Sequence, residues 1–277
     1  EQVELTLEYG GFPQESMPTM QGSKELSGEY LCLENAALSP RLMNVMPGED
    51  GYPATIEITL PAAMTVIPFG ASEAEVVAEH GDGTKTWRYE TNRAGGILYA
   101  GDYVREEIQA GGLTIDFYYG RKHQAVMEAA GAAEAVLAVM DYCAGHYGSL
   151  AFGDGERLKL IQSRVAGGGY AGDGASLLDE ADFTAHNLGD ADKGGGAAEV
   201  MIHELVHQWW GLGNMFDTAG PDSPWSAEGL TCYTTYRIAK ELYGEDYARE
   251  HYVNQWRAEV EDYYLNFYVR HPEYLEA

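Results

Sequence analysis

The chain of 277 residues is 45% hydrophobic and 12% aromatic, which is enough apolar material for one large domain or two smaller ones. Its 44 acidic residues outnumber 17 basic ones, and the formal charge of −27 would repel phosphate backbones and anionic lipid surfaces. We therefore expect no nucleic-acid partner, and we interpret the charge as a strongly solvated surface.

Direct membrane insertion is not expected of this segment, because it contains no run of roughly 20 apolar residues. The start, Glu1 to Glu4, has neither the basic region nor the apolar core of a signal peptide, and the chain stops abruptly at Ala277. We expect a fragment of a longer protein, truncated at the C-terminus, and we favour an extracytoplasmic or membrane-anchored location for it. The three cysteines make no C-x-x-C pair and do not fix the compartment.

Residues 1–119 are expected to form an N-terminal antiparallel β-domain. Short β-branched and aromatic runs alternate there with Pro and Gly breaks, at intervals typical of sandwiches. The predicted strands are Val3 to Tyr9, Ala54 to Leu60, Thr65 to Phe69, Thr84 to Glu90, Gly96 to Ala100 and Leu113 to Tyr119. No titratable cluster with ligand spacing occurs in this half, so we interpret it as a scaffold beside a catalytic domain.

Residues 120–277 have a different pattern, which predicts a second domain beginning near Gly120 and an α+β fold for the whole chain. The stretch Gln124 to Tyr147 carries apolar residues at helical spacing. Strands are expected over Leu158 to Gln162 and Ser176 to Leu178, with a glycine-rich bend between them. Three further helices are predicted, one from about Ala197, one over Ala227 to Tyr243 and one over Glu245 to Tyr268.

The helix from Ala197 contains the sequence H-E-L-V-H, which begins at His203 and ends at His207. Two histidines four residues apart project from one helical face, so one metal ion can bind both. Zinc prefers imidazole and carboxylate ligands, and a catalytic zinc site leaves its fourth position to water. Glu204 follows the first histidine, so its carboxylate can act as the general base toward a zinc-activated water.

A surface helix can hold two histidines and a glutamate by chance, but two observations argue against chance here. The helix is unusually apolar around the motif, so buried polar side chains there need partners. In addition, Glu228 lies in the sequence W-S-A-E-G-L, which opens the next predicted helix after a loop long enough to fold back. A catalytic zinc site requires a third protein ligand besides the two histidines, and a carboxylate can fill that role.

These residues resemble the membrane alanyl aminopeptidase family of gluzincin metallopeptidases, in which H-E-x-x-H is followed by a glutamate ligand in a W-x-x-E-G context. The resemblance covers roughly residues 120–268. It implies a thermolysin-like catalytic domain, with the zinc site on a helix, behind a β-domain. It also implies zinc as the cofactor, with His203, His207 and Glu228 as its ligands, and Glu204 as the general base.

Four departures from the family's pattern concern function. Ala171 and Gly172 stand where the family's G-x-M-E-N strand has the glutamate that holds a free amino terminus and the asparagine after it, so exopeptidase specificity is not expected. Between His207 and Glu228 the chain has two residues more than the family's usual spacing. Thr235 stands where the family has a glutamate that orients a ligating histidine. The sequence also ends before the family's Y-x-K-G segment, which carries a transition-state tyrosine.

Gly168, Gly169 and Tyr170 begin the stretch that corresponds to the family's substrate strand. Their backbone groups can pair with an extended peptide as an added strand, or the glycine run can be a tight bend alone. We therefore predict an aminopeptidase-like zinc metallopeptidase that hydrolyses peptide bonds. The alternative is a non-catalytic peptide-binding or sensing module with a zinc-peptidase fold, as the extracytoplasmic part of a membrane or transport-associated protein.

Overall fold

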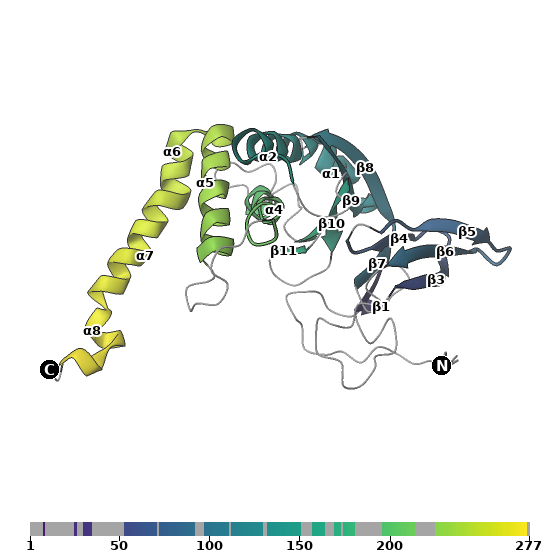
Figure 1. Ribbon diagram of the computed structural model, residues 1–277, viewed down its shortest axis with the longest axis horizontal. Coiled ribbons are helices and arrows are strands. Elements are labelled where there is room, and N and C mark those ends of the chain that lie inside the picture. Colours follow the sequence, from purple (N-terminus) through teal and green to yellow (C-terminus); the bar gives the residue numbers. More distant parts are fainter. Residues whose placement is uncertain are drawn as a thin grey trace.

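The protein has a mixed α/β fold that combines two antiparallel sheets, one mixed sheet and a set of helices (Figure 1). The computed structural model describes residues 8, 25–26, 30–34, 53–70, 72–91, 97–110, 112–129, 132–150, 157–163, 169–172, 174–180, 196–213 and 225–275. Among these residues, no helix is both long enough and apolar enough to span a bilayer.

Two antiparallel sheets form the N-terminal half of the described chain. The four-stranded sheet has the order β1 (Glu25–Leu26), β2 (Tyr30–Glu34), β7 (Ile97–Gly101), β4 (Thr65–Pro68). The three-stranded sheet has the order β3 (Ala54–Pro61), β6 (Thr84–Thr91), β5 (Glu75–Glu79). The predictions that correspond to β3, β4, β6 and β7 are confirmed, whereas the predicted strand Val3 to Tyr9 lies outside the described residues except for Glu8.

The third sheet is mixed and has five strands, in the order β11 (Gly169–Gly172), β12 (Ala175–Asp179), β10 (Arg157–Ser163), β9 (Leu113–Gly120), β8 (Tyr103–Ala110). Strands β12, β10 and β9 run parallel, and the outer strands β11 and β8 pair antiparallel with their neighbours. Because β9 pairs with β10, this sheet continues across the domain boundary that the sequence predicts near Gly120. The expected glycine-rich bend also contains a strand, β11, at the edge of the sheet.

Two α-helices lie between β9 and β10 in the sequence, and the other described α-helices come after β12. In chain order, the helices are α1 (Gln124–Ala129), α2 (Ala132–Tyr147), α4 (Gly196–Val206), α5 (Leu230–Tyr243), α6 (Glu245–Ala248), α7 (Asn254–Leu265) and α8 (Phe267–Arg270), with π-helical segments at Trp225–Gly229 and Arg249–Val253. Short 3₁₀ helices span Arg121–His123 and Pro272–Leu275. Helix α6 lies beside the end of α5, and α7 and α8 continue away from the other elements (Figure 1); no residue of α7 is buried.

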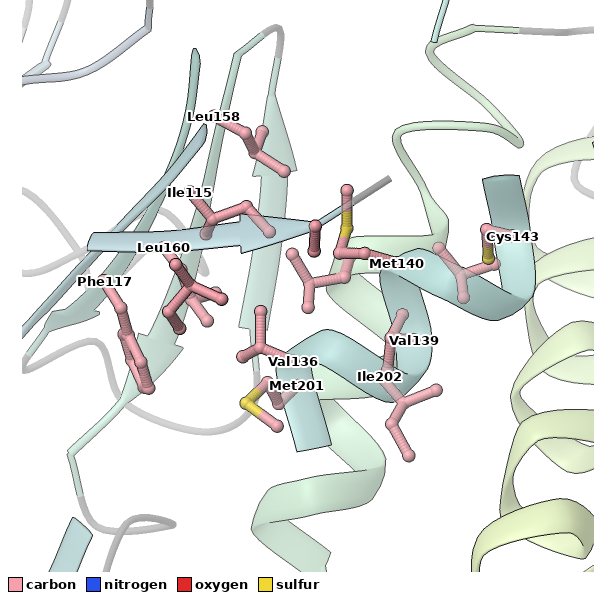
Figure 2. Close-up of a cluster of buried hydrophobic side chains, with 14 of the residues drawn as sticks. Ile115, Phe117, Val136, Val139, Met140, Cys143, Leu158, Leu160, Met201 and Ile202 are labelled. Atoms are coloured by element: carbon pink, nitrogen blue, oxygen red, sulfur yellow. The ribbon is translucent and has the colours of Figure 1, made fainter. Parts of the chain in front are cut away.

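One face of the five-stranded sheet is covered by helices α2 and α4. On β9, Ile115 and Phe117 point to this face, as alternate residues of a strand must. They pack against Val136 and Met140 of α2 and against Met201 of α4 (Figure 2). The buried positions of α2 recur at three- and four-residue intervals, so its apolar stripe is long enough to cover the sheet.

The opposite face of the same sheet packs against the four-stranded sheet. Tyr118 of β9, Ile161 of β10 and Leu177 of β12 form a second buried cluster with Ile67 and Tyr99. The central strands are therefore buried on both faces, and every residue of β10 after Arg157 is buried although Lys159, Gln162 and Ser163 are polar.

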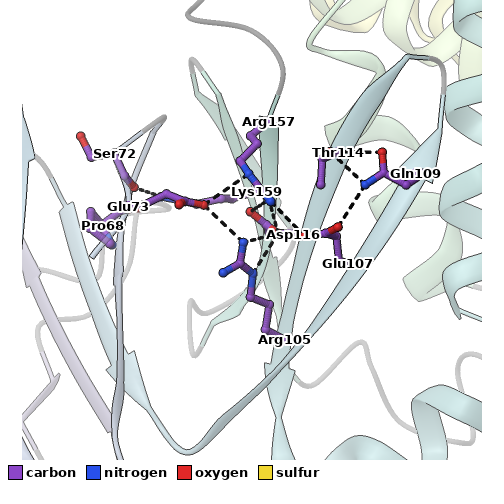
Figure 3. A network of polar contacts seen from close by, with 10 residues as sticks. All are labelled: Pro68, Ser72, Glu73, Arg105, Glu107, Gln109, Thr114, Asp116, Arg157 and Lys159. Atoms are coloured by element: carbon purple, nitrogen blue, oxygen red, sulfur yellow. Dashed lines mark hydrogen bonds and ion pairs between the residues drawn. The ribbon is translucent and has the colours of Figure 1, made fainter. Parts of the chain in front are cut away.

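A network of charged side chains, of which Asp116 and Lys159 are buried, lies on this side of the mixed sheet (Figure 3). Asp116 of β9 is fully buried and accepts two hydrogen bonds of 2.9 Å from Nη1 of Arg157 and one of 2.9 Å from Nε of Arg105. Both arginines also pair with Glu73, at 3.3 and 3.4 Å. Arg105 lies in β8, which the sequence analysis missed because charged residues interrupt its apolar pattern; the network neutralises part of that charge.

Lys159 extends this network to the other sheet. Its side chain is buried, and Nζ donates hydrogen bonds to the carbonyl oxygens of Pro68, at 2.8 Å, and Ser72. Burial lowers the pKa of Lys159 to about 8, although Glu73 and Asp116 partly offset that effect. The residue thus ties the end of β4 to β10.

We expect Asp116→Ala to lower the free energy of unfolding by about 1.5–3 kcal/mol, because it removes the charge-assisted hydrogen bonds that this buried carboxylate accepts from Arg105 and Arg157. Glu107→Gln is the matched control, since Glu107 is half exposed and contacts the same Arg157 at 2.9 Å. Its effect should stay below about 1 kcal/mol. Urea unfolding of both variants measures the difference, and equal effects would contradict this account of the network.

Candidate metal centre

Helix α4 is oriented by its apolar side chains. Met201, Ile202 and Leu205 are completely buried in the core against α2 and the sheet, which leaves the face with His203 directed away from that core. The backbone N–H of His207 donates to the carbonyl oxygen of His203 at 3.1 Å, so the helical turn continues one residue beyond the end of α4. The two imidazole rings therefore lie one turn apart, with centroids separated by 4.6 Å.

Glu228 reaches the same place from the π-helical segment that precedes α5. Close approach of this segment to the end of α4 depends on Gly211, whose φ is +96°. A Cβ at Gly211 would lie 3.1 Å from Cβ of Ala227 and 3.4 Å from Nδ1 of His207. Glycine is the residue that tolerates this backbone conformation at low cost.

Three ligand-type atoms converge at this point. Nε2 of His203 lies 3.0 Å from Nε2 of His207 and 3.2 Å from Oε2 of Glu228, and the remaining distance, from His207 to Glu228, is 3.4 Å. Ligands about 2.0–2.1 Å from a tetrahedral zinc ion are separated by about 3.3 Å. The three distances scatter around that value, so the donor set and its spacing fit zinc.

The tautomer of His207 also fits metal binding. Its Nδ1 lies 3.0 Å from the carbonyl oxygen of Trp210, which can only accept, so Nδ1 carries the proton. Nε2 therefore presents a lone pair to the other two ligand atoms. Oγ1 of Thr231, at 3.3 Å, gives Nδ1 a second polar neighbour, and such partners fix the orientation of a ligating ring.

At Nδ1, the imidazole of His203 has a weaker hydrogen-bond partner than that of His207. Its Nδ1 lies 4.0 Å from Sγ of Cys232, a weak partner. Burial, reinforced by the neighbouring His207, lowers the pKa of His203, which keeps its imidazole in the neutral form that binds metal. The hydroxyl of Thr235 donates its hydrogen to the carbonyl oxygen of Thr231 at 2.8 Å and so does not donate it to an imidazole.

Glu204 is 7% exposed and lies beside this cluster. Burial, with a smaller contribution from the charge of Glu228, raises the pKa of Glu204 to about 8. A divalent cation held by the three ligand atoms would lower that pKa, because a nearby positive charge favours the carboxylate. The side chain of Glu204 points to β11, where it contacts Gly169.

The residues predicted to bind substrate do not all lie on the same side of the sheet. Gly169 and Tyr170 lie in β11, whereas Gly168 is outside the described residues. Gly169 faces Glu204, but Tyr170 points to the other side of the sheet, where its ring lies 6.0 Å from that of Phe69. Of the two described members of this set, Gly169 is therefore the one that lies beside the cluster.

Three contacts to the imidazoles were not found in the sequence. Thr231 and Cys232 lie three and four residues after Glu228, so helical spacing alone places them on the same side of α5. The third partner, the carbonyl oxygen of Trp210, belongs to the backbone and leaves no sequence signal.

Comparisons with known proteins give little further information. No family model matches the sequence, and no curated protein matches it. Among solved structures, the chain is similar to a crystal structure of a mutant two-domain M1 zinc metallopeptidase bound to L-tryptophan, with 18% identity and a TM-score of 0.48. The match covers 75% of this chain and 44% of that one, so the chain spans less than half its length. A likeness at this level assigns no role to any residue here.

We expect the purified protein to bind one zinc ion per chain and His207→Ala to weaken that binding by more than about 100-fold. Loss of groups that merely orient a ligand already costs about 10–100-fold, so loss of a ligand should cost more. His80→Asn is the control, because His80 follows strand β5 and its ring nitrogen contacts Thr86. Competition with a chromophoric chelator measures the zinc affinity of both variants. Similar affinities would show that His207 is not a zinc ligand.

Proposed function

We propose that this chain is the zinc-binding part of a metallopeptidase with a thermolysin-like catalytic unit. The observation that carries the proposal is the convergence of His203, His207 and Glu228, whose ligand atoms lie 3.0–3.4 Å apart, beside the buried carboxylate of Glu204. Two imidazoles and one carboxylate leave one position of a tetrahedral site open, as catalytic zinc sites do.

The chemistry is divided between the cofactor and Glu204. When bound, zinc polarises the scissile carbonyl and activates the attacking water. Glu204 acts as the general base: it takes a proton from that water and returns it to the leaving amine. Its position supports this role, because the buried Glu204 side chain lies beside the three ligand atoms and directly follows His203.

We propose that the substrate is an extended peptide that pairs with β11. No described strand pairs with the outer side of this strand, so its N–H and C=O groups can bind a peptide backbone. Ala171 lies opposite Ser176, whose hydroxyl contacts α4, and so faces the metal side of the sheet. A methyl group there cannot hold the amino terminus of a peptide, which favours cleavage within a chain over removal of its first residue.

We expect Glu204→Gln to lower kcat for peptide hydrolysis by about 10²–10⁴-fold while one zinc ion per chain is retained, because it removes the base and leaves the ligands in place. Glu241→Gln on exposed α5 surface is the control and should retain parental kcat. A fluorogenic peptide blocked at both ends, assayed beside zinc analysis, measures both. Parental activity in Glu204→Gln would sink the mechanism, and no hydrolysis by the parent would favour a peptide-binding module instead.

The identity of residue 171 gives a separate test. Ala171→Glu places a carboxylate on the metal side of β11, and a charge-assisted hydrogen bond to a free amino terminus should raise the rate on unblocked relative to N-acetylated peptides by roughly 10-fold or more. Ala171→Gln has the same size without the charge and should give a smaller change. If the two variants showed the same preference, residue 171 would not face the substrate's amino terminus.

A further inference from the structure

The backbone of β11 lies directly against the side chain of Glu204. A Cβ built on Gly169 would lie 2.3 Å from Cγ of Glu204 and 2.7 Å from both Cδ and Oε1. Distances this short are severe overlaps, since carbon atoms in contact are about 3.5–4.0 Å apart. Residue 169 can therefore carry no side chain while Glu204 keeps its conformation.

We propose that Gly169 is a positioning residue for Glu204, and that the bare backbone of β11 is the surface that holds this carboxylate beside the metal ligands. This inference rests on the proposed function, because it concerns the general base of that reaction. It gives Gly169 a different role from the substrate contact that the sequence predicts.

Packing has to fix the carboxylate because polar contacts do not. Among the described residues, no hydrogen bond or ion pair fixes the carboxylate of Glu204. A glutamate side chain has several rotamers of similar energy unless neighbours exclude them. The Gly169 backbone closes one side of the space that Glu204 occupies.

Strand β11 cannot easily retreat from α4 to make room. Nε2 of Gln208 donates to the carbonyl oxygen of Gly172 at 3.1 Å and to Oγ of Ser176 at 3.3 Å. Oγ of Ser176 in turn donates to the backbone carbonyl of Glu204 at 2.9 Å. These buried hydrogen bonds join both strands of the β11–β12 pair to the zinc-binding helix.

The opposite side of β11 is also occupied. A Cβ at Gly172 would lie 2.5 Å from Cε1 of Phe69, which packs there from the end of β4. The strand is held between Phe69 and α4, so a methyl group at residue 169 must displace the Glu204 side chain. Because the nearest overlap involves Cγ, near the root of that side chain, the carboxylate moves with it.

We expect Gly169→Ala to lower kcat for a blocked peptide by at least about 10-fold, with KM changed by less than about threefold and with one zinc ion still bound. A misplaced base affects the chemical step, whereas loss of a substrate contact would mainly raise KM. Gly145→Ala is the control, since its added methyl group would meet no atom within 4 Å and should leave kcat unchanged.

A double-mutant cycle on thermal stability tests the contact between Gly169 and Glu204 independently of catalysis. Overlap in a packed site should make Gly169→Ala lower the Tm by roughly 2–8 °C in the parent protein. In the Glu204→Ala background the overlapping atoms are gone, so the same change should leave the Tm unchanged or raise it slightly. Differential scanning calorimetry of the four proteins, each with zinc, measures the difference.

The outcomes separate this inference from the proposed function. If the parent hydrolyses no peptide, the proposed function fails, and the stability cycle still decides whether Gly169 confines Glu204. If the parent is active, either a kcat for Gly169→Ala within twofold of the parental value or an equal Tm change in both backgrounds overturns the inference. A lower kcat together with a background-dependent Tm change supports it.

Discussion

The rest of the structure depends on the burial of both faces of the central sheet. Alternate residues of β9 and β10 point in opposite directions, so Ile115 and Phe117 pack under α2 and α4 while Tyr118 and Ile161 pack on the four-stranded sheet. A shift of one residue in either strand would place apolar groups against charges and Asp116 against the helices. This alternation therefore fixes where β12, β11 and α4 lie.

The burial that holds α4 in place also shifts the pKa values of its polar side chains. The same low-polarity surroundings raise the pKa of Glu204 and lower that of His203, so burial favours the neutral form of both side chains. Removing these groups from water costs stability, and a cation bound by them would offset part of that cost. The folding and the proposed metal binding of this protein are therefore expected to be linked.

Sequence patterns predicted the strands that alternate between apolar and polar residues and the helices with an apolar stripe. They missed β8, because Arg105 and its acidic neighbours interrupt the alternation of apolar and polar residues. The ion pairs that stabilise Arg105 in this strand involve Glu73 and Asp116, which are distant in sequence. They also predicted a domain boundary near Gly120, and the mixed sheet contains strands from both sides of that position. Composition reports the change from strand to helix, whereas sheet membership depends on pairing between β9 and β10.

For the metal cluster, the sequence by itself determined that His203 and His207 share one side of a helix, because the α-helix repeats every 3.6 residues. It also supplied Glu228 as a candidate third ligand and Glu204 as a candidate base. Only the tertiary structure decided that the three ligand atoms come within 3.4 Å of one another and that Glu204 lies against Gly169. Those distances depend on how α4, β11 and the segment before α5 pack together, and packing between distant segments leaves no local pattern in the sequence.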